Sequence, residues 1–192
     1  RGVDPGLYGR LITELHRIGV LSVLDSEGEP LRLATRAGPS ILSPNELEAE
    51  ELVGHEFADE EDRRTAVREI VELGAREALM TRADGCLALV GCDGDPARPR
   101  RLCRATLEPL EPVSSVGSGD AFLAGYVAAR YGGGEDLDCL RFGVACGAES
   151  TQHFGAGVVD PREVDRLVGE VQIEVEGAPV LAPAAGPARV PS

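Results

Sequence analysis

The chain has 192 residues, a length that suits one domain with a sizeable hydrophobic core. Its formal net charge of -14 at pH 7 argues against a nucleic acid or an anionic membrane as partner, because both are bound through clustered cations. The sequence contains no lysine. A P-loop and a Schiff-base enzyme, which both need a lysine, are therefore excluded. No apolar run approaches the roughly 20 residues of a membrane-spanning helix.

The cysteines form no Cys-x-x-Cys pair and have no histidine at metal-binding spacing. An odd number of cysteines without a recognisable signal peptide is typical of reduced thiols, which predicts a cytoplasmic location. We expect each one to pack in the core. They are Cys86, Cys92, Cys103, Cys139 and Cys146.

The first part of the chain alternates helical patterns with short apolar runs. Asp4-Pro5 is typical of a helix start, and apolar residues at helical spacing follow until Gly19. The elements expected here are a helix over 7–18, a strand over 20–24, a turn and short helix from 25, a strand over 40–42, and helices over 45–53 and 59–73. A strand that ends at Asp25 would deliver that carboxylate to the sheet edge where α/β proteins bind ligands.

The second part of the chain begins with a hairpin signal, because Asp84-Gly85 separates two apolar runs. The expected elements are strands over 78–80 and 86–90, a polar loop over 91–99, a strand over 101–107, and helices after 117, over 137–150 and over 161–171. From residue 177 the chain is rich in proline and alanine, which predicts a disordered tail over 177–192. The alternation predicts an α/β sandwich with a mostly parallel sheet over 1–176.

The run Ser114-Ser-Val-Gly-Ser-Gly-Asp-Ala-Phe-Leu-Ala-Gly-Tyr126 predicts a tight turn that opens a buried helix. Glycine lets the backbone approach a ligand, and the amides at a helix N-terminus attract an anion. An acid beside such a site suits proton or metal chemistry, so Asp120 is the candidate general base. The residues alone leave a second interpretation open, in which Ser118 or Asp120 is an ordinary N-cap.

The segment Ser43-Pro-Asn-Glu-Leu-Glu48 supports two interpretations. Asn45 followed three residues later by Glu48 is typical of a capping box. Carboxylate and amide oxygens also suit Mg²⁺, which keeps several waters in protein sites. The two interpretations are compatible.

The run from Ser114 to Tyr126 closely resembles the C-terminal signature of the PfkB (ribokinase-like) carbohydrate kinases. Its Gly-Ser-Gly-Asp form is most similar to the phosphosugar kinases of that family, such as 1-phosphofructokinase and tagatose-6-phosphate kinase. The resemblance implies that Asp120 deprotonates the acceptor hydroxyl. It also implies that amides around Gly117, Ser118 and Gly119 hold the transferring phosphoryl group.

Further segments resemble other parts of the family pattern. The resemblance implies that Asn45 and Glu48 organise Mg²⁺, water and the ATP phosphates, and that Gly85, Gly147 and Gly155 line the nucleotide site together with Gly119. Asp25-Ser-Glu-Gly28 resembles a family turn and supports the fold only. Residues 80–85 depart from the expected Ser-x-Gly-x-x-Gly, because Met80 and Arg82 replace the serine and the first glycine. His153 could touch the base, although a lone histidine is more often a surface or capping residue.

The resemblance runs from about residue 4 to 168 and implies a three-layer α/β/α ribokinase-like sandwich whose N-terminal part and lid are missing. The implied function is ATP-dependent phosphorylation of a hydroxyl on a sugar phosphate, with little activity from this portion alone. A homodimer of the full-length form is one option, with no nucleic-acid or membrane partner. The alternative is a non-catalytic nucleotide-binding or regulatory remnant. The identity of the sugar and the oligomeric state are left open.

Overall fold

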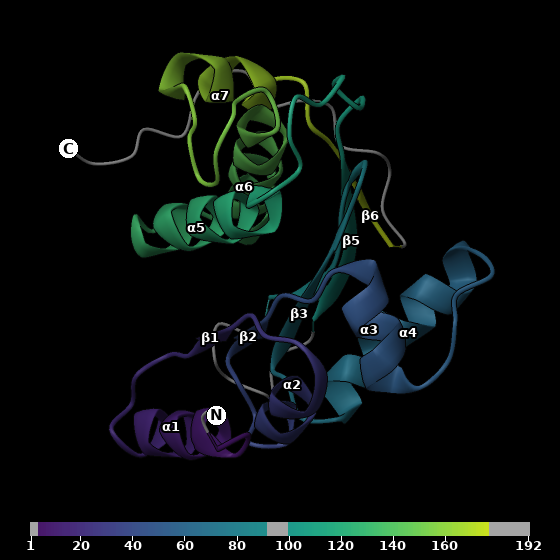
Figure 1. Ribbon diagram of the computed structural model, residues 1–192, viewed down its shortest axis with the longest axis vertical. Coiled ribbons are helices and arrows are strands. Elements are labelled where there is room, and N and C mark those ends of the chain that lie inside the picture. The colour runs from purple at the N-terminus through teal and green to yellow at the C-terminus, as the bar shows by residue number, and fades with distance from the viewer. Residues whose placement is uncertain (1–3, 92–99, 177–192) are drawn as a thin grey trace. The chain divides into compact units, whose positions relative to one another are not determined.

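The computed structural model describes residues 4–91 and 100–176 (Figure 1). The described residues divide into two compact units, one made of residues 4–81, 87–91 and 100–102 and the other of residues 82–86 and 103–176. Its described strands belong to one sheet in the order β1-β2-β3-β4-β5-β6. They are β1 (Val23–Leu24), β2 (Ile41–Leu42), β3 (Glu77–Arg82), β4 (Gly85–Val90), β5 (Arg101–Thr106) and β6 (Gln172–Val175).

The described helices fall between these strands. They are α1 (Leu7–Arg17), α2 (Gly28–Thr35), α3 (Glu46–Val53), α4 (Glu60–Glu72), α5 (Ser118–Tyr131), α6 (Asp136–Ser150) and α7 (Pro161–Val168). In the first unit α1 packs with α2 and α3 with α4. In the second unit α5 packs closely on α6, and α6 also contacts α7 (Figure 1).

Strands β1, β2 and β3 of the first unit pair in parallel, with Val23 opposite Ile41 and Leu42 opposite Ala78. The strand expected over 20–24 is shortened to two residues. Its preceding residue, Ser22, donates its amide to the Oγ of Ser40 at 3.1 Å instead of to a backbone carbonyl. The hydroxyl groups of Ser22 and Ser40 thus replace backbone carbonyls as acceptors at the start of the β1–β2 pairing. A buried apolar cluster fills this unit and includes Leu31, Leu42, Ala66, Val67, Ile70, Ala78 and Met80.

In the second unit β5 pairs with β6 in antiparallel, with Ala105 opposite Ile173. Strand β6 was not expected from the sequence, and the helix predicted over 161–171 ends at Val168. Ile173 is buried between the exposed Gln172 and Glu174, the alternation of a strand with one face covered. The sheet is therefore mixed, with parallel pairing among β1 to β3 and antiparallel pairing between β5 and β6.

The structure confirms most of the expected elements. The α/β class is confirmed, and β3 and β4 flank the predicted turn as neighbours in the sheet. Four cysteines, Cys86, Cys103, Cys139 and Cys146, are buried free thiols as expected. Cys92, the rest of its predicted polar loop and the predicted tail over 177–192 lie outside the described residues. Across residues 4–91 and 100–176, no helix has the length and apolarity needed to cross a bilayer.

Candidate active site

The turn before α5 is built on Gly117, which has left-handed backbone angles of φ 82° and ψ 8°. A Cβ atom on Gly117 would lie 2.6 Å from the Cβ of Ala156, so only glycine fits this position. Gly117 is the N-cap residue, and no side chain caps the helix. The interpretation of Ser118 or Asp120 as an ordinary N-cap is therefore wrong. Instead, the hydroxyl of Ser118 donates to the carbonyl of Ser115 at 3.0 Å.

The uncapped start of α5 has the features of an anion site. Its first-turn amides receive no side-chain acceptor, although the amide of Ser118 donates within the turn to the carbonyl of Ser115 at 3.3 Å. A helix N-terminus carries the equivalent of about half a positive charge. At Gly119 nothing lies within 4 Å of where a Cβ would stand, so the turn is open on that side. An anionic group could therefore approach the backbone of Gly117, Ser118 and Gly119 directly.

Asp120 lies in the first turn of α5 with its side chain exposed. Within the parts of the chain that the structure describes, its carboxylate makes no hydrogen bond or ion pair with another residue. Its position beside an uncapped helix start leaves the carboxylate available to a ligand. This combination is what a general base next to a bound phosphoryl group requires.

Helix α6 packs against the first turn of α5. A Cβ on Gly147 would lie 3.1 Å from the Cβ of Phe122 and 3.2 Å from the carbonyl of Ser118, so Gly147 lies in the packed contact between the two helices. Close helix packing accounts for this glycine. Gly155 is exposed in the loop after α6, with φ 103°.

Asn45 and Glu48 form a complete capping box at the start of α3 in the first unit. The Oδ1 of Asn45 accepts from the amide of Glu48 at 3.0 Å, and the Oε2 of Glu48 accepts from the amide of Asn45 at 2.8 Å. Asn45 also bridges to Thr81 of β3, which fixes the start of α3 beside that strand. No group of three or more His, Cys, Asp and Glu residues is arranged to hold a metal ion among the described residues.

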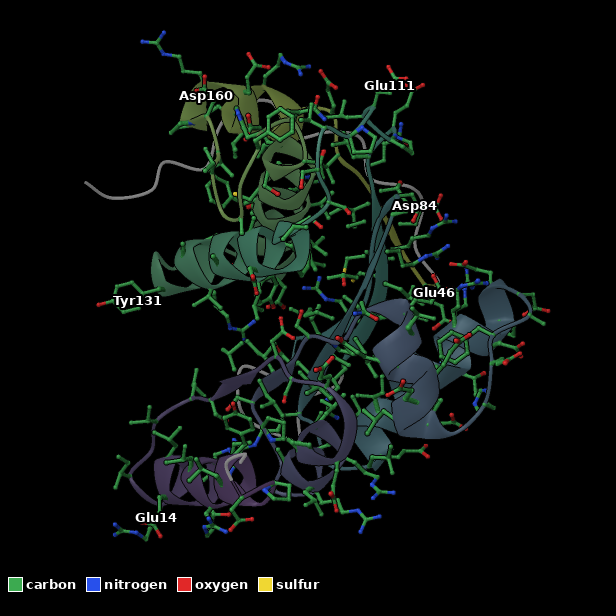
Figure 2. All side chains as sticks on the ribbon, viewed as in Figure 1. Glu14, Glu46, Asp84, Glu111, Tyr131 and Asp160 are labelled. Carbon is green, nitrogen blue, oxygen red and sulfur yellow. The ribbon has the colours of Figure 1, made fainter. Side chains whose placement is uncertain are left out.

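The segment over 80–85, which departs from the expected glycine-rich pattern, is held by a buried side chain and by an ion pair. Met80 is fully buried. Arg82 is only 14% exposed and lies 3.5 Å from the carboxylate of Asp84, so it is not a solvated residue. Arg104 forms a second ion pair with the carboxylate of Asp84 at 3.0 Å (Asp84 is labelled in Figure 2). A Cβ on Gly85 would lie 2.0 Å from the carbonyl of Ala105, so close backbone approach requires this glycine.

The predicted site residues thus form two groups, one in each unit. Asn45 and Glu48 form the first, in the unit that contains residues 4–81. The structure brings together the turn at 117–120 and Gly147 in the other unit, where the loop that contains Gly155 contacts Gly117. Gly85 belongs to this second unit and lies at β5.

Residues 4–162 match the model of the pfkB family carbohydrate kinases. The chain belongs to this family. The match covers both the segment of Asn45 and Glu48 and the turn before Asp120. The expectation drawn from the signature around Asp120 is therefore confirmed at the level of the family.

Individual relatives of this PfkB chain are named as phosphofructokinases. It is 29% identical over 187 residues to 1-phosphofructokinase of Haemophilus influenzae, covering 92% of the chain and 55% of that relative. It is 27% identical to ATP-dependent 6-phosphofructokinase isozyme 2 of Escherichia coli, covering 86% of the chain and 52% of the relative. The solved structure of Escherichia coli phosphofructokinase-2 with potassium superposes with a TM-score of 0.74 at 26% identity, over 85% of the chain and 51% of that structure.

These matches establish the ribokinase-like fold, and they also show how much of each relative the chain covers. The chain spans about half the length of the curated relatives it matches. The family and fold are therefore shown for this half, whereas the activity of a whole protein is a matter for proposal.

Two residues of the site in this PfkB chain were missed from the sequence. The carbonyl of Thr151 accepts from the amides of both Val113 and Ser114, at 2.8 and 3.1 Å, and anchors the segment that leads into the turn. Glu149, in the last turn of α6, is a buried carboxylate. An acid within the small-residue run from Phe142 to Ser150 was the available signal, because buried carboxylates need partners.

Proposed function

We propose that this PfkB chain is the catalytic portion of a kinase that transfers the γ-phosphoryl group of ATP to a hydroxyl of a sugar phosphate. The observation that carries the proposal is the free carboxylate of Asp120 beside the uncapped N-terminus of α5. The acceptor is inferred from the relative named 1-phosphofructokinase, and the donor from the relative named ATP-dependent.

In the proposed mechanism, Asp120 takes the proton of the sugar hydroxyl as its oxygen attacks phosphorus. The amides of the turn at 117–119 receive the negative charge that develops on the transferring phosphoryl oxygens. Phosphoryl transfer depends mainly on positioning and electrostatics, and correct positioning can supply about 7–11 kcal/mol of barrier reduction. We therefore expect a chain of about half the relatives' length to have little activity alone.

Magnesium would be held on the side of Asn45 and Glu48. Both side chains are occupied by the capping box, but within the described residues the second carboxylate oxygen of Glu48, Oε1, takes part in no hydrogen bond. One free carboxylate oxygen fits a water-mediated contact to Mg²⁺ better than direct coordination. The ion would neutralise charge on the ATP phosphates.

The proposal is tested by calorimetry of ATP-Mg²⁺ binding to this chain. We expect Asp120→Asn to keep binding nearly intact, because it removes the base and preserves the turn. We expect Asn45→Ala to weaken binding. Asp59→Ala is the matched control, because it removes the side-chain cap of the neighbouring helix α4 in the same unit. Equal weakening by Asp59→Ala and Asn45→Ala would mean that helix stability alone explains the effect.

A non-catalytic nucleotide-binding remnant is the second candidate. The burial of Met80 and the pairing of Arg82 with Asp84 favour it, because the glycine-rich phosphate loop expected there is absent. In a protein of the relatives' full length, Asp120→Asn separates the two. A kinase would lose about 10²–10⁴-fold in turnover with binding retained, and a remnant would show no turnover before the substitution.

A further inference from the structure

Glu149 is a buried carboxylate with both oxygens engaged. Its side chain is 3% exposed, and its Oε1 lies 2.6 Å from the Nε2 of His153. Its Oε2 accepts from the backbone amide of Asp160 at 3.0 Å. Asp160, labelled in Figure 2, is the N-cap of α7 and accepts from the amide of Arg162. One side chain of α6 therefore contacts the loop over 151–160 at two points, His153 near its start and Asp160 at its end.

The loop that Glu149 contacts packs against the turn before α5. Its first residue, Thr151, accepts the amides of Val113 and Ser114 through its carbonyl. Its central residue, Ala156, places its Cβ 2.6 Å from where a Cβ on Gly117 would stand. The loop therefore meets the segment over 113–117 at two points, and the left-handed conformation of Gly117 is packed against it.

We propose that Glu149 is a positioning residue for the phosphoryl-binding turn. It does not touch the ligand; it fixes loop 151–160, and that loop fixes Gly117 and the amides that follow. The proposal rests on the proposed function, which makes the turn at 117–119 the site of the transferring phosphoryl group. It accounts for a buried acid in a helix whose other buried residues are mostly small or apolar.

Removal of the carboxylate would release the loop at His153 and at Asp160. The amide of Asp160 and the partly exposed ring of His153 would lose their partner, and water could replace the carboxylate only if the loop opened around the buried position of residue 149. Gly117 would then lose the contact that selects its conformation. Preorganised donors are effective because they need no reordering when charge develops, so a mobile turn binds phosphate more weakly.

The test uses the 192-residue chain with Glu149→Ala, Glu149→Gln and Asp136→Ala. Asp136 pairs with Arg130 at 3.2 Å and is 12% exposed, at the opposite end of α6, so Asp136→Ala is a matched loss of a partly buried charge pair. Glutamine preserves the shape of Glu149, accepts from the Asp160 amide and donates to a neutral His153. Two quantities are measured: hydrogen exchange of the amides in 113–119 and 151–160, and the dissociation constant of ATP-Mg²⁺.

We expect Glu149→Ala to speed exchange in both segments and to weaken ATP-Mg²⁺ binding about 10-fold or more, whereas Glu149→Gln and Asp136→Ala stay near the wild type in both. Unchanged exchange in Glu149→Ala, or the same pattern in Asp136→Ala, would overturn the proposal. So would unchanged affinity in Glu149→Ala where the wild type binds. If the wild-type chain binds no nucleotide, the proposed function fails and the exchange measurement alone decides the role of Glu149.

Discussion

Gly125 on α5 lies so close to Cys146 on α6 that a Cβ on the glycine would stand 2.7 Å from the cysteine Sγ and 2.9 Å from its Cβ. Real Cβ atoms do not approach other atoms this closely. The contact sets how near the two helices can come, and it lies on α5, the helix that begins after Gly117.

We therefore expect Gly125→Ala to lower the free energy of unfolding by about 1–3 kcal/mol, because the added methyl group overpacks the contact. Gly9→Ala is the control, since its Cβ would be in ordinary contact at 3.6 Å from the carbonyl of Leu33. That substitution should stabilise α1 by about 0.5–1 kcal/mol. Urea unfolding of both variants checks the pair, and a Gly125→Ala protein as stable as the wild type would contradict the packing argument.

Gly117→Ala should weaken ATP-Mg²⁺ binding more than its loss of stability explains. The substitution adds backbone strain at φ 82° and also pushes Ala156 away from the turn. Gly133→Ala carries nearly the same strain, at φ 83°, with nothing within 4 Å of the new Cβ. Calorimetry and urea unfolding of both variants separate the two effects. Equal affinities in the two variants would mean that the contact with Ala156 is unimportant to binding.

The capping box predicts an asymmetry between two substitutions of Asn45. Asn45→Ala removes the acceptor for the amide of Glu48 and should cost about 1 kcal/mol of unfolding free energy. Asn45→Asp keeps an acceptor at the N-cap and should remain near the wild type. Urea midpoints test the difference, which would vanish if α3 were held only by its packing.

The buried cysteines should be unreactive in the folded chain. Burial raises the pKa of the Cys139 thiol to about 11 and that of the Cys146 thiol to about 12, and it also raises the pKa of Cys86. Only the thiolate is nucleophilic, so iodoacetamide at about pH 8 should label these sites slowly until denaturant is added. Peptide mapping identifies each site. Rapid labelling of any of the three in the native chain would show that its helix or strand opens readily.

The histidines His55 and His16 should affect stability in opposite directions with pH. The hydrogen bond from His55 to Glu69 raises the pKa of His55, so its stabilising effect is present below about pH 6.5 and is lost as pH rises through the folded value. Burial, with the charge of Arg76, lowers the pKa of His16, so its contribution is instead lost as pH falls below about 6.5.

The pH effect is measured as the urea midpoint of the wild type minus that of Glu69→Gln, from about pH 5 to about pH 8. We expect this difference to be larger on the acid side. Because Glu69 and His55 are both partly exposed, the effect should be small and should shrink in high salt. A difference that is constant with pH would contradict the pairing.

Much of the site was predictable because it depends on local rules. Gly117 needs a left-handed angle, and Asn45 with Glu48 obeys the capping-box spacing, so both follow from short stretches of sequence. Glu149 was missed because one partner, the amide of Asp160, lies eleven residues away across a loop, and the i,i+4 partner, His153, lies beyond the end of α6. Strand β6 was missed because the helical pattern before it continued through Val171, and its pairing with β5 is distant in sequence.

The double acceptor at Thr151 has an electrostatic consequence. Helix α6 ends near the place where α5 begins, so the negative end of one helix dipole approaches the positive end of the other. A bare carbonyl at the end of α6 would direct its field at an incoming phosphate and offset the attraction of the α5 amides. The carbonyl of Thr151 is not bare, because it accepts hydrogen bonds from the amides of Val113 and Ser114. The same two hydrogen bonds that shape the loop would therefore shield the proposed anion site from its neighbouring helix.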